Sequence, residues 1–383
     1  MYAHMIVPQA PLVFRSGRPF GEGSRDGANF PWPSSLAGVL RSQVMDDRGW
    51  HGKLDDAQQQ ALRDLAAHGP ILAERCRDGL TPMLPKPADA LLLVDDAGGK
   101  AYHRLLPGKL PAGCACDLPP GLQPLLLAGD HKGKPQAGPA FWSLARLLAW
   151  RRGEAVAAFE HDEPLRETRS HVALSRATLA ADPGRLFQTE GLDFSRRRRA
   201  SGRGFGDRDW VFLCRFAQVL SGRMLAFGGE GRLSRLDTAP DDALAAPPDY
   251  LTALANARHI TLTLATPALF ADGWRPRWLD EGDARASEAG ASGTVPGIPG
   301  LQLVLKAAAV DRWQGISGWD LATWDAKPAR KAVAAGATYW FEVVGDPPAG
   351  WAERLWLVPI SDQPQDRRDG FGLVIPGFWN ERS

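Results

Sequence analysis

The spacing of apolar residues predicts a strand, a loop and a helix at the start of the chain. Residues 5–15 cluster apolar and β-branched side chains, which predicts an opening strand. Residues 16–30 are rich in glycine and polar side chains and predict a loop. Pro33, Ser34 and Ser35 predict a helix start, because proline fits a first turn and serine caps free N–H groups. The helically spaced apolar face consists of Leu36, Val39, Leu40 and Val44.

The middle of the chain alternates short patterned segments with stretches rich in proline and glycine. A second helix is predicted at 55–68 and is expected to end at Gly69 and Pro70. Residues 79–138 are expected to be irregular apart from one strand at 90–94. The other predicted elements are a helix at 141–150 and strands at 171–174, 185–194 (with a turn at Gly191) and 210–216.

The acidic, unpatterned segment 237–249 separates two halves of the chain. After it, alternating apolar residues predict a strand at 259–264, and residues 280–300 are expected to be an insertion. Later strands are predicted at 301–305, 338–344 and 371–375.

This order of elements favours an α+β fold. Strand, insertion, two strands, a short connection and a last strand are consistent with a ferredoxin-like βαββαβ unit whose helices are eroded. A chain of 383 residues is too long for one ordinary domain. We therefore predict an N-terminal domain at 1–240, compatible with a second and heavily inserted copy of the unit, and a C-terminal domain at 250–383.

Composition narrows the class of protein. With 44% hydrophobic and 23% charged residues, the chain is typical of a globular protein. No apolar run approaches the roughly 18 residues of a membrane helix, and the first residues lack the features of a signal peptide. The four scattered cysteines are too few for a disulfide framework. We therefore expect a cytoplasmic protein without membrane contact.

Positive charge is concentrated in the middle of the chain. The formal net charge is only +1, but the segment from Arg146 to Arg235 holds 17 arginines, no lysine and 11 acidic residues. Arginine offers a planar fork for phosphate and stacks on bases, which favours an RNA partner. A GC-rich genome would produce the same excess of arginine, so composition alone leaves the partner open.

Four segments combine the residue types that contact single-stranded RNA. They are the loop at 15–21, the helix start at Ser34 and Ser35, the basic segment 196–208 and the glycine loop 370–377. Cations follow phosphates and aromatic rings stack on bases. A helix start presents free N–H groups to an anion, and glycine lets the backbone approach a ligand closely. Each segment alone is equally compatible with a solvated loop, but their co-occurrence favours RNA binding.

Candidate metal and catalytic motifs carry less weight. Cys114 and Cys116 lack the second ligand pair of a zinc site, and residues 129–135 do not have phosphate-loop spacing. His171 is compatible with acid–base cleavage of RNA, with a hydrogen bond to ribose or phosphate, or with a structural role. We expect no metal and no cofactor.

Several short phrases occur in an order that resembles the third subunit of the type III-B CRISPR effector, the Cmr complex of the RAMP superfamily. They are PLVFRSGRPFG (11–21), PSSLAGVLR (33–41), LFQTEGL (186–192), GGEGRL (228–233), GISGWD (315–320) and the closing DGFGLVIPGFW (369–379). The resemblance therefore runs from residue 11 to residue 379.

The resemblance implies two RAMP-type ferredoxin-like, or RRM-like, domains with large insertions in the N-terminal one. It implies a non-catalytic subunit that caps the base of the complex and holds the repeat-derived 5′ tag of the crRNA. Its expected neighbours are the large signalling subunit and the first backbone RAMP subunit. The positions that the resemblance implies as contacts to the tag are the opening loop, the helix start at Ser34 and Ser35, the segment 185–190 and the glycine loop. The tract 196–199 and the insertion 280–300 are not part of the shared phrases. From the resemblance and the residue types together, the expected RNA-binding residues are Arg15, Arg18, Phe20, Ser34, Ser35, Arg41, Arg169, His171, Arg185, Gln188, Arg196, Arg197, Gly370, Gly372 and Gly377.

Two alternative functions stay open on the sequence. Some RAMP relatives cleave repeat RNA without a metal, and His171 would then be the residue to test. The 14 tryptophans, Trp319 and Trp324 among them, are also compatible with a wedge that binds only other proteins.

Overall fold

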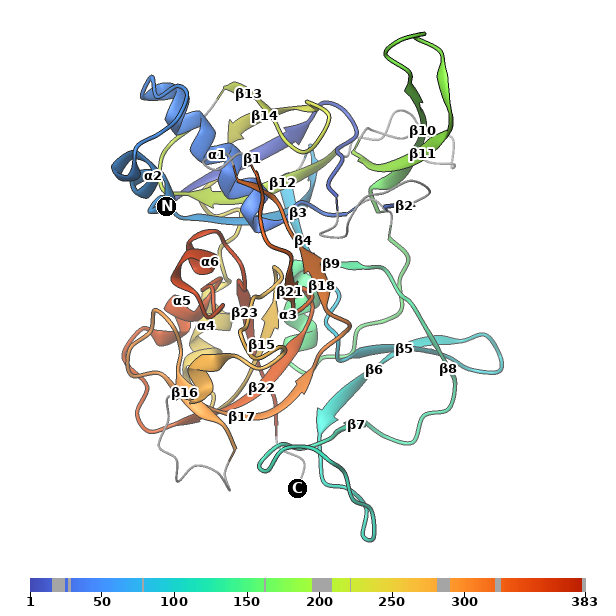
Figure 1. Cartoon of the computed structure of the whole chain (residues 1–383). Coiled ribbons are helices and arrows are strands. Elements are labelled where there is room, and N and C mark those ends of the chain that lie inside the picture. The colour runs from blue at the N-terminus through green and yellow to red at the C-terminus, as the bar shows by residue number, and fades with distance from the viewer. Residues whose placement is uncertain are drawn as a thin grey trace. The chain divides into compact units, whose positions relative to one another are not determined.

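A computed structural model describes residues 1–15, 29–77, 79–161, 163–194, 209–220, 222–280, 290–320 and 325–380, with the backbone alone at 25–26, 183–185 and 280. The chain forms two compact units (Figure 1). Unit 1 comprises residues 1–81, 164–243 and 315–331, and unit 2 comprises residues 82–163, 244–314 and 332–383. Each unit therefore takes segments from separate parts of the chain. Residues 82–163, which fall within the predicted N-terminal domain, belong to unit 2.

The centre of unit 1 is an antiparallel sheet. Its strands are β1 (Tyr2–Pro8), β3 (Ala67–Cys76), β12 (Asp209–Phe216), β13 (Arg223–Ala226) and β14 (Leu233–Thr238). They lie side by side in the order β13-β14-β1-β12-β3. Without β13, the four remaining strands lie in the order β14, β1, β12, β3. They are the fourth, first, third and second of this set in chain order. The predicted opening strand is present, but it ends at Pro8.

Helix α1 (Pro33–Asp47) contacts β3 through its predicted apolar face, and Leu36, Leu40 and Val44 are buried. Its N-cap is Trp32, without a side-chain cap hydrogen bond. The predicted serine cap is therefore wrong, and the two serines lie in the first turn.

Helix α2 (Asp56–Arg63) begins at a capping box formed by Asp55 and Gln58. The predicted end at Gly69 is wrong. The helix stops at Arg63, because the chain from Ala67 onward pairs with β12.

A long hairpin of β10 (Leu165–Leu174) and β11 (Ala181–Asp193) extends away from the sheet of unit 1 (Figure 1). The predicted turn at Gly191 is wrong, because this glycine pairs with Glu167 inside the hairpin. Five short strands lie outside this sheet and hairpin. β2 (Arg25–Asp26) pairs with β11. The others form two pairs, β18 (Gln314–Ile316) with β21 (Arg330–Ala332) and β19 (Trp319–Asp320) with β20 (Asp325–Ala326).

Unit 2 contains a second antiparallel sheet. Its strands are β15 (His259–Leu264), β16 (Ser292–Thr294), β17 (Gln302–Ala309), β22 (Thr338–Val344) and β23 (Val374–Phe378). Their order is β16-β17-β22-β15-β23. Followed from β23, the four longest strands are again the fourth, first, third and second of their set in chain order. The associated helices are α4 (Pro248–Ala255), η1 (Arg277–Asp280), α5 (Trp351–Leu355) and α6 (Pro364–Arg368). The predictions of strands at 259–264 and 338–344 are confirmed.

Residues 82–163 add a smaller sheet and a helix to unit 2. The strands of this part are β5 (Ala90–Val94), β6 (Lys100–Pro107), β7 (Leu125–Leu127) and β8 (Lys134–Gln136), followed by β9 (Phe141–Ser143) and helix α3 (Leu144–Arg151), with β4 (Gly79–Pro85) before them. The predicted strand at 90–94 is confirmed. The expectation of an otherwise irregular region at 79–138 is wrong, because β6, β7 and β8 build a sheet on β5. The helix predicted at 141–150 begins only at Leu144, because residues 141–143 form β9 and pair with β4.

The whole is a mixed α and β structure made mostly of antiparallel strands with few helices, which confirms the α+β class. No helix among the described residues is both long enough and apolar enough to span a membrane.

Candidate nucleic-acid interface

In unit 1, the segment after β1 is held between two neighbours. Leu12 exchanges two backbone hydrogen bonds of 2.8 Å with Leu192 at the end of β11. On the next residue, the carbonyl of Val13 accepts a 2.7 Å hydrogen bond from the N–H of Gly229. This double anchoring places the exposed Arg15 at a fixed point beside the start of α1.

The loop that anchors Val13 requires glycine. Gly228 has a φ of +97°, and a Cβ there would lie 2.9 Å from the Val13 carbonyl oxygen. An alanine would therefore strain both the backbone angle and the close approach of the two segments. The next residue, Gly229, is the donor to Val13, and Glu230 follows with a left-handed φ of 61°.

The first turn of α1 faces the same space. The indole N–H of Trp32 donates to the carbonyl of Arg15 at 3.3 Å, which ties the helix start to the loop. Because Pro33 has no N–H, Ser34 is the first residue of the helix with a backbone donor. The positive end of the helix dipole therefore lies beside Arg15.

These elements enclose a cavity of about 780 Å³, which we call the α1 cavity. Its lining residues are Val13, Phe14, Arg15, Trp32, Ser34, Ser35, Gly38, Val39, Ser42, Gln43, Ala226, Phe227, Gly228, Gly229, Glu230, Ser317, Gly318, Trp319 and Lys327. All of them belong to unit 1, although they come from three separate parts of the chain.

An aromatic ring and a cation complete one wall of the α1 cavity. Trp319 keeps 55% of its surface exposed, and the exposed Lys327 directly follows β20, whose Ala326 pairs with Trp319. The backbone N–H of Lys327 donates to the carbonyl of Gly318 at 2.8 Å, which holds this wall together. With Arg15, the α1 cavity thus has two cations and one flat ring in its lining, the residue types that bind phosphates and a base.

The acidic residue of the α1 cavity is paired. Glu230 forms a 2.6 Å ion pair with Arg232. It also acts on the hairpin, where the hydrogen bond with Glu167 raises the pKa of Arg169 and the charge of Glu230 raises it further. Arg169 is thus within electrostatic reach of the α1 cavity.

The other predicted hairpin residues lie on both faces of β10 and β11. The Nε2 atom of His171 is 2.8 Å from the Thr189 hydroxyl, and its ring stacks on Phe187 with centroids 5.1 Å apart. Gln188 donates to Ser170 on the opposite face, at 3.4 Å. His171 therefore has a structural partner on one ring nitrogen.

Arg41 lies away from the α1 cavity. Its guanidinium donates to the carbonyls of Leu65, at 2.8 and 3.1 Å, and of Arg63, at 3.3 Å. The side chain thus has a structural role, because it hydrogen-bonds backbone carbonyls at the end of α2 and just after it.

The three glycines predicted near the C-terminus belong to unit 2. Gly370 and Gly372 have φ angles of 89° and 80°, and the carbonyl of Gly370 accepts a hydrogen bond from Thr266. Gly377 lies inside β23, where a Cβ would come within 2.6 Å of Arg151. A Cβ at Gly372 would lie 2.8 Å from the Ser361 hydroxyl oxygen. Internal packing thus accounts for the absence of a side chain at both Gly372 and Gly377.

Four predicted residues, Arg18, Phe20, Arg196 and Arg197, lie outside the described residues, as does the side chain of Arg185. Of the others, the structure brings Arg15, Ser34 and Ser35 together.

Sequence reasoning missed Trp319 and Lys327 as possible RNA contacts. The phrase GISGWD marks the segment of Trp319, but its long distance in sequence from Arg15 hides their proximity. Within the described part of the chain, no group of three or more His, Cys, Asp or Glu side chains could hold a metal ion.

Comparison with known proteins gives the family. Two solved chains similar to this one are from cryo-EM structures of the Type III-B Cmr-beta, one bound to cognate target RNA and AMPPnP, the other to cognate target RNA. The first is 12% identical with a TM-score of 0.47, the second 14% identical with a TM-score of 0.46; each alignment covers 88% of this chain and 86% of that chain. No match is found among curated proteins. The family described as CRISPR-associated protein (Cas_Cmr3) matches residues 4–379, so this chain belongs to the Cmr3 family, as its sequence phrases predict.

Proposed function

We propose that this chain is the non-catalytic RNA-binding subunit of a type III-B CRISPR effector, and that its α1 cavity holds the repeat-derived 5′ tag of the crRNA. The observation that carries the proposal is the convergence of Arg15, the first turn of α1, Trp319 and Lys327 on one cavity. The large signalling subunit and the first backbone RAMP subunit are its proposed neighbours at the base of the complex.

The chemistry of the α1 cavity suits single-stranded RNA. Arg15 and Lys327 supply charge for phosphates, the first turn of α1 supplies the backbone N–H of Ser34, and Trp319 supplies a stacking surface. The glycine loop at Gly228 and Gly229 presents backbone without side chains. Recognition by stacking and backbone contact needs no catalytic group, in keeping with a binding role.

We also propose that both units are RAMP-type ferredoxin-like domains. The order fourth, first, third, second among antiparallel strands, found in each unit, supports this assignment. The predicted domain limits, 1–240 and 250–383, remain a prediction.

Gly38 offers a direct test. This helical residue lines the α1 cavity, and a Cβ there would meet nothing within 4 Å. Gly38→Leu should therefore fill the cavity without lowering the melting temperature, because leucine favours a helix over glycine. We expect it to weaken binding of 5′-labelled tag RNA roughly tenfold, the cost of losing base stacking. Asp46→Leu, exposed on α1 and outside the cavity lining, is the matched control.

The measurement is a gel-shift series on the full chain, alone and with its large-subunit partner, using tag RNA and scrambled RNA without added metal. Preferential binding of tag RNA that is lost in Gly38→Leu would support the proposal. Equal binding of both RNAs, or an unaffected Gly38→Leu variant, would contradict it. A shorter labelled product that disappears in His171→Ala would instead identify an endoribonuclease.

A further inference from the structure

The side chain of Gln43 lines the α1 cavity without a hydrogen bond to any described residue. It is half-buried on α1, so part of its surface is withdrawn from water. Its neighbour in the lining, Ser42, donates instead to the carbonyl of Gly38, at 3.0 Å. Within the part of the chain that the structure describes, the amide of Gln43 therefore keeps its acceptor and its donors for a group from outside the protein.

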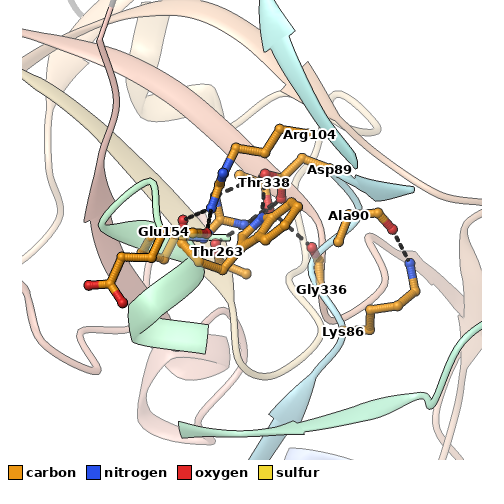
Figure 2. Close-up of polar contacts among 10 residues, drawn as sticks. Lys86, Asp89, Ala90, Arg104, Glu154, Thr263, Gly336 and Thr338 are labelled. Atoms are coloured by element: carbon orange, nitrogen blue, oxygen red, sulfur yellow. Dashed lines mark hydrogen bonds and ion pairs between the residues drawn. The ribbon is translucent and has the colours of Figure 1, made fainter. Parts of the chain in front are cut away.

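The core of unit 2 shows the opposite state of buried polar groups. Asp89 forms a buried ion pair with Arg151. The carboxylate of Asp89 also accepts from the indole of Trp150, at 2.9 Å, and from the hydroxyl of Thr338, at 3.3 Å (Figure 2). Arg104 of the same cluster donates to three backbone carbonyls, at 2.6, 2.7 and 3.1 Å (Figure 2). These groups bind one another and have a structural role, whereas the amide in the α1 cavity is left for a ligand.

Gln43 shares one face of α1 with the first turn of that helix. The residues of α1 that line the cavity form two rows with a spacing of four, one of residues 34, 38 and 42 and one of residues 35, 39 and 43. Residues four apart lie one above the other on a helix, so the cavity runs along this face. At a rise of about 1.5 Å per residue, Gln43 lies roughly 12 Å along the helix axis from Ser35.

This length suits one nucleotide. A phosphate at the first turn of α1 would contact the backbone N–H of Ser34 and the charge of Arg15. The attached base would then reach along the helix toward Gln43, since a purine nucleotide spans a comparable length from its phosphate to the edge of its base. Gly38 lies between the two ends, and a Cβ there would meet nothing within 4 Å, so the sugar and the ring have room.

The chemistry of an amide favours one base. Glutamine presents an acceptor and a donor side by side, and it forms two hydrogen bonds with a base edge that shows a donor next to an acceptor. Adenine shows this combination on both of its edges, where the 6-amino group lies beside N1 and beside N7. Guanine shows two acceptors, O6 and N7, on its Hoogsteen edge, and the pyrimidines show the combination only on their Watson–Crick edge. Adenine is therefore the base that the amide can bind through either edge.

We propose that Gln43 selects an adenine base in the α1 cavity, with the phosphate of that nucleotide at the first turn of α1. This inference rests on the function proposed above and adds a base-specific contact to it. Phosphate contacts and stacking on Trp319 tolerate any sequence, so they give affinity without selection. Gln43 is then a specificity-determining residue of the RNA site.

A pair of short oligoribonucleotides tests this role. One is oligoadenylate, and the other carries purine riboside at every position, which keeps the ring, sugar and phosphates but lacks the 6-amino group. In gel shifts with the full chain, the wild type should bind oligoadenylate roughly tenfold more tightly, the effect of one bidentate contact. Gln43→Leu should lose this preference, because leucine cannot hydrogen-bond the amino group.

The Gln43→Leu variant should fold as the wild type does. Leucine favours a helix as strongly as glutamine, and the amide has no partner among the described residues, so the melting temperature should not fall. Gln60→Leu is the matched control, since Gln60 lies on α2, outside the cavity lining, where it donates to Asp64 at 2.8 Å. This control should keep the wild-type preference for oligoadenylate.

The role of Gln43 would be overturned if the wild type did not bind oligoadenylate, or bound both oligomers equally, or if Gln43→Leu kept the wild-type preference. This failure is distinct from failure of the proposed function. If Gly38→Leu weakens binding of tag RNA but the adenine preference is absent, only the role of Gln43 is wrong. If Gly38→Leu binds tag RNA as tightly as the wild type, the α1 cavity is not the RNA site and both proposals are wrong.

Discussion

Asp89 and Arg151 show how strongly one residue of this chain can depend on another. Asp89→Ala would leave a buried arginine charge without its carboxylate. We expect a loss of about 3–5 kcal/mol in the free energy of unfolding, because the desolvated charge is no longer compensated. Urea unfolding of the full chain, followed by tryptophan fluorescence, measures this loss.

The ion pair of Asp47 and Arg223 provides the comparison, since both side chains are more than one third exposed. Asp47→Ala should cost less than about 1 kcal/mol, as solvent screens such pairs. If Asp89→Ala cost no more than Asp47→Ala, the buried pair would stabilise the protein no more than an exposed pair does.

Gly377 marks the limit of sequence reasoning for single residues. A glycine near a chain end is compatible with close approach of RNA, and the sequence carries no sign of an internal neighbour. The structure provides one, because Arg151, 226 positions earlier, packs against the place of its missing side chain. Arg15 and Ser34 are near in sequence, and their joint location could be predicted. Trp319 could not be placed beside them, because only the folded chain brings it there.

At the scale of elements, the pairing of β3 with β12 creates a pH dependence. His68 of β3 lies opposite Arg215 of β12. Burial, and then the charge of Arg215, lower the pKa of His68 to about 4, from 6.5. Because the unfolded chain binds a proton more readily than the folded chain, this histidine reduces stability as the pH falls from about 6.5 to about 4. Above pH 6.5 it has no such effect.

His68→Gln tests this prediction, since it removes the titrating group. Between pH 6 and pH 4, the wild type should lose up to about 1.4 kcal/mol per pH unit more than the variant in free energy of unfolding. Acidic residues titrate in the same range, but they are common to both proteins. Parallel pH profiles for the two proteins would contradict the assignment.

Elements with a clean local pattern could be predicted from the sequence. The alternation at 259–264 and the apolar run at 338–344 match β15 and β22 in full. The sequence predicts a helix that continues to His68, but pairing with β12 places Ala67 and His68 in β3. The sheet at 90–136 escaped prediction for the same reason, since its short strands depend on partners far along the chain.

For the whole molecule, charge is balanced, with 45 basic and 44 acidic residues. General attraction to RNA is therefore weak, and binding should depend on the local cations of the α1 cavity. The two kinds of contact proposed there respond differently to salt. A lysine that neutralises a phosphate contributes to the salt dependence, by about 0.7 in the slope of log K against log salt concentration on single strands. A stacked ring contributes affinity without that dependence.

Lys327→Ala and Trp319→Ala separate these contributions under the proposed function. Lys327→Ala should reduce the magnitude of the slope for tag RNA by about 0.7, because one phosphate is no longer neutralised. Trp319→Ala should leave the slope unchanged and weaken binding by about 1–3 kcal/mol at every salt concentration. Lys100, which lies 3.8 Å from Glu160 in unit 2, provides the control variant Lys100→Ala, with wild-type slope and affinity. Identical slopes for Lys327→Ala and Lys100→Ala would show that Lys327 does not meet a phosphate, and the α1 cavity would lose one of its two proposed cations.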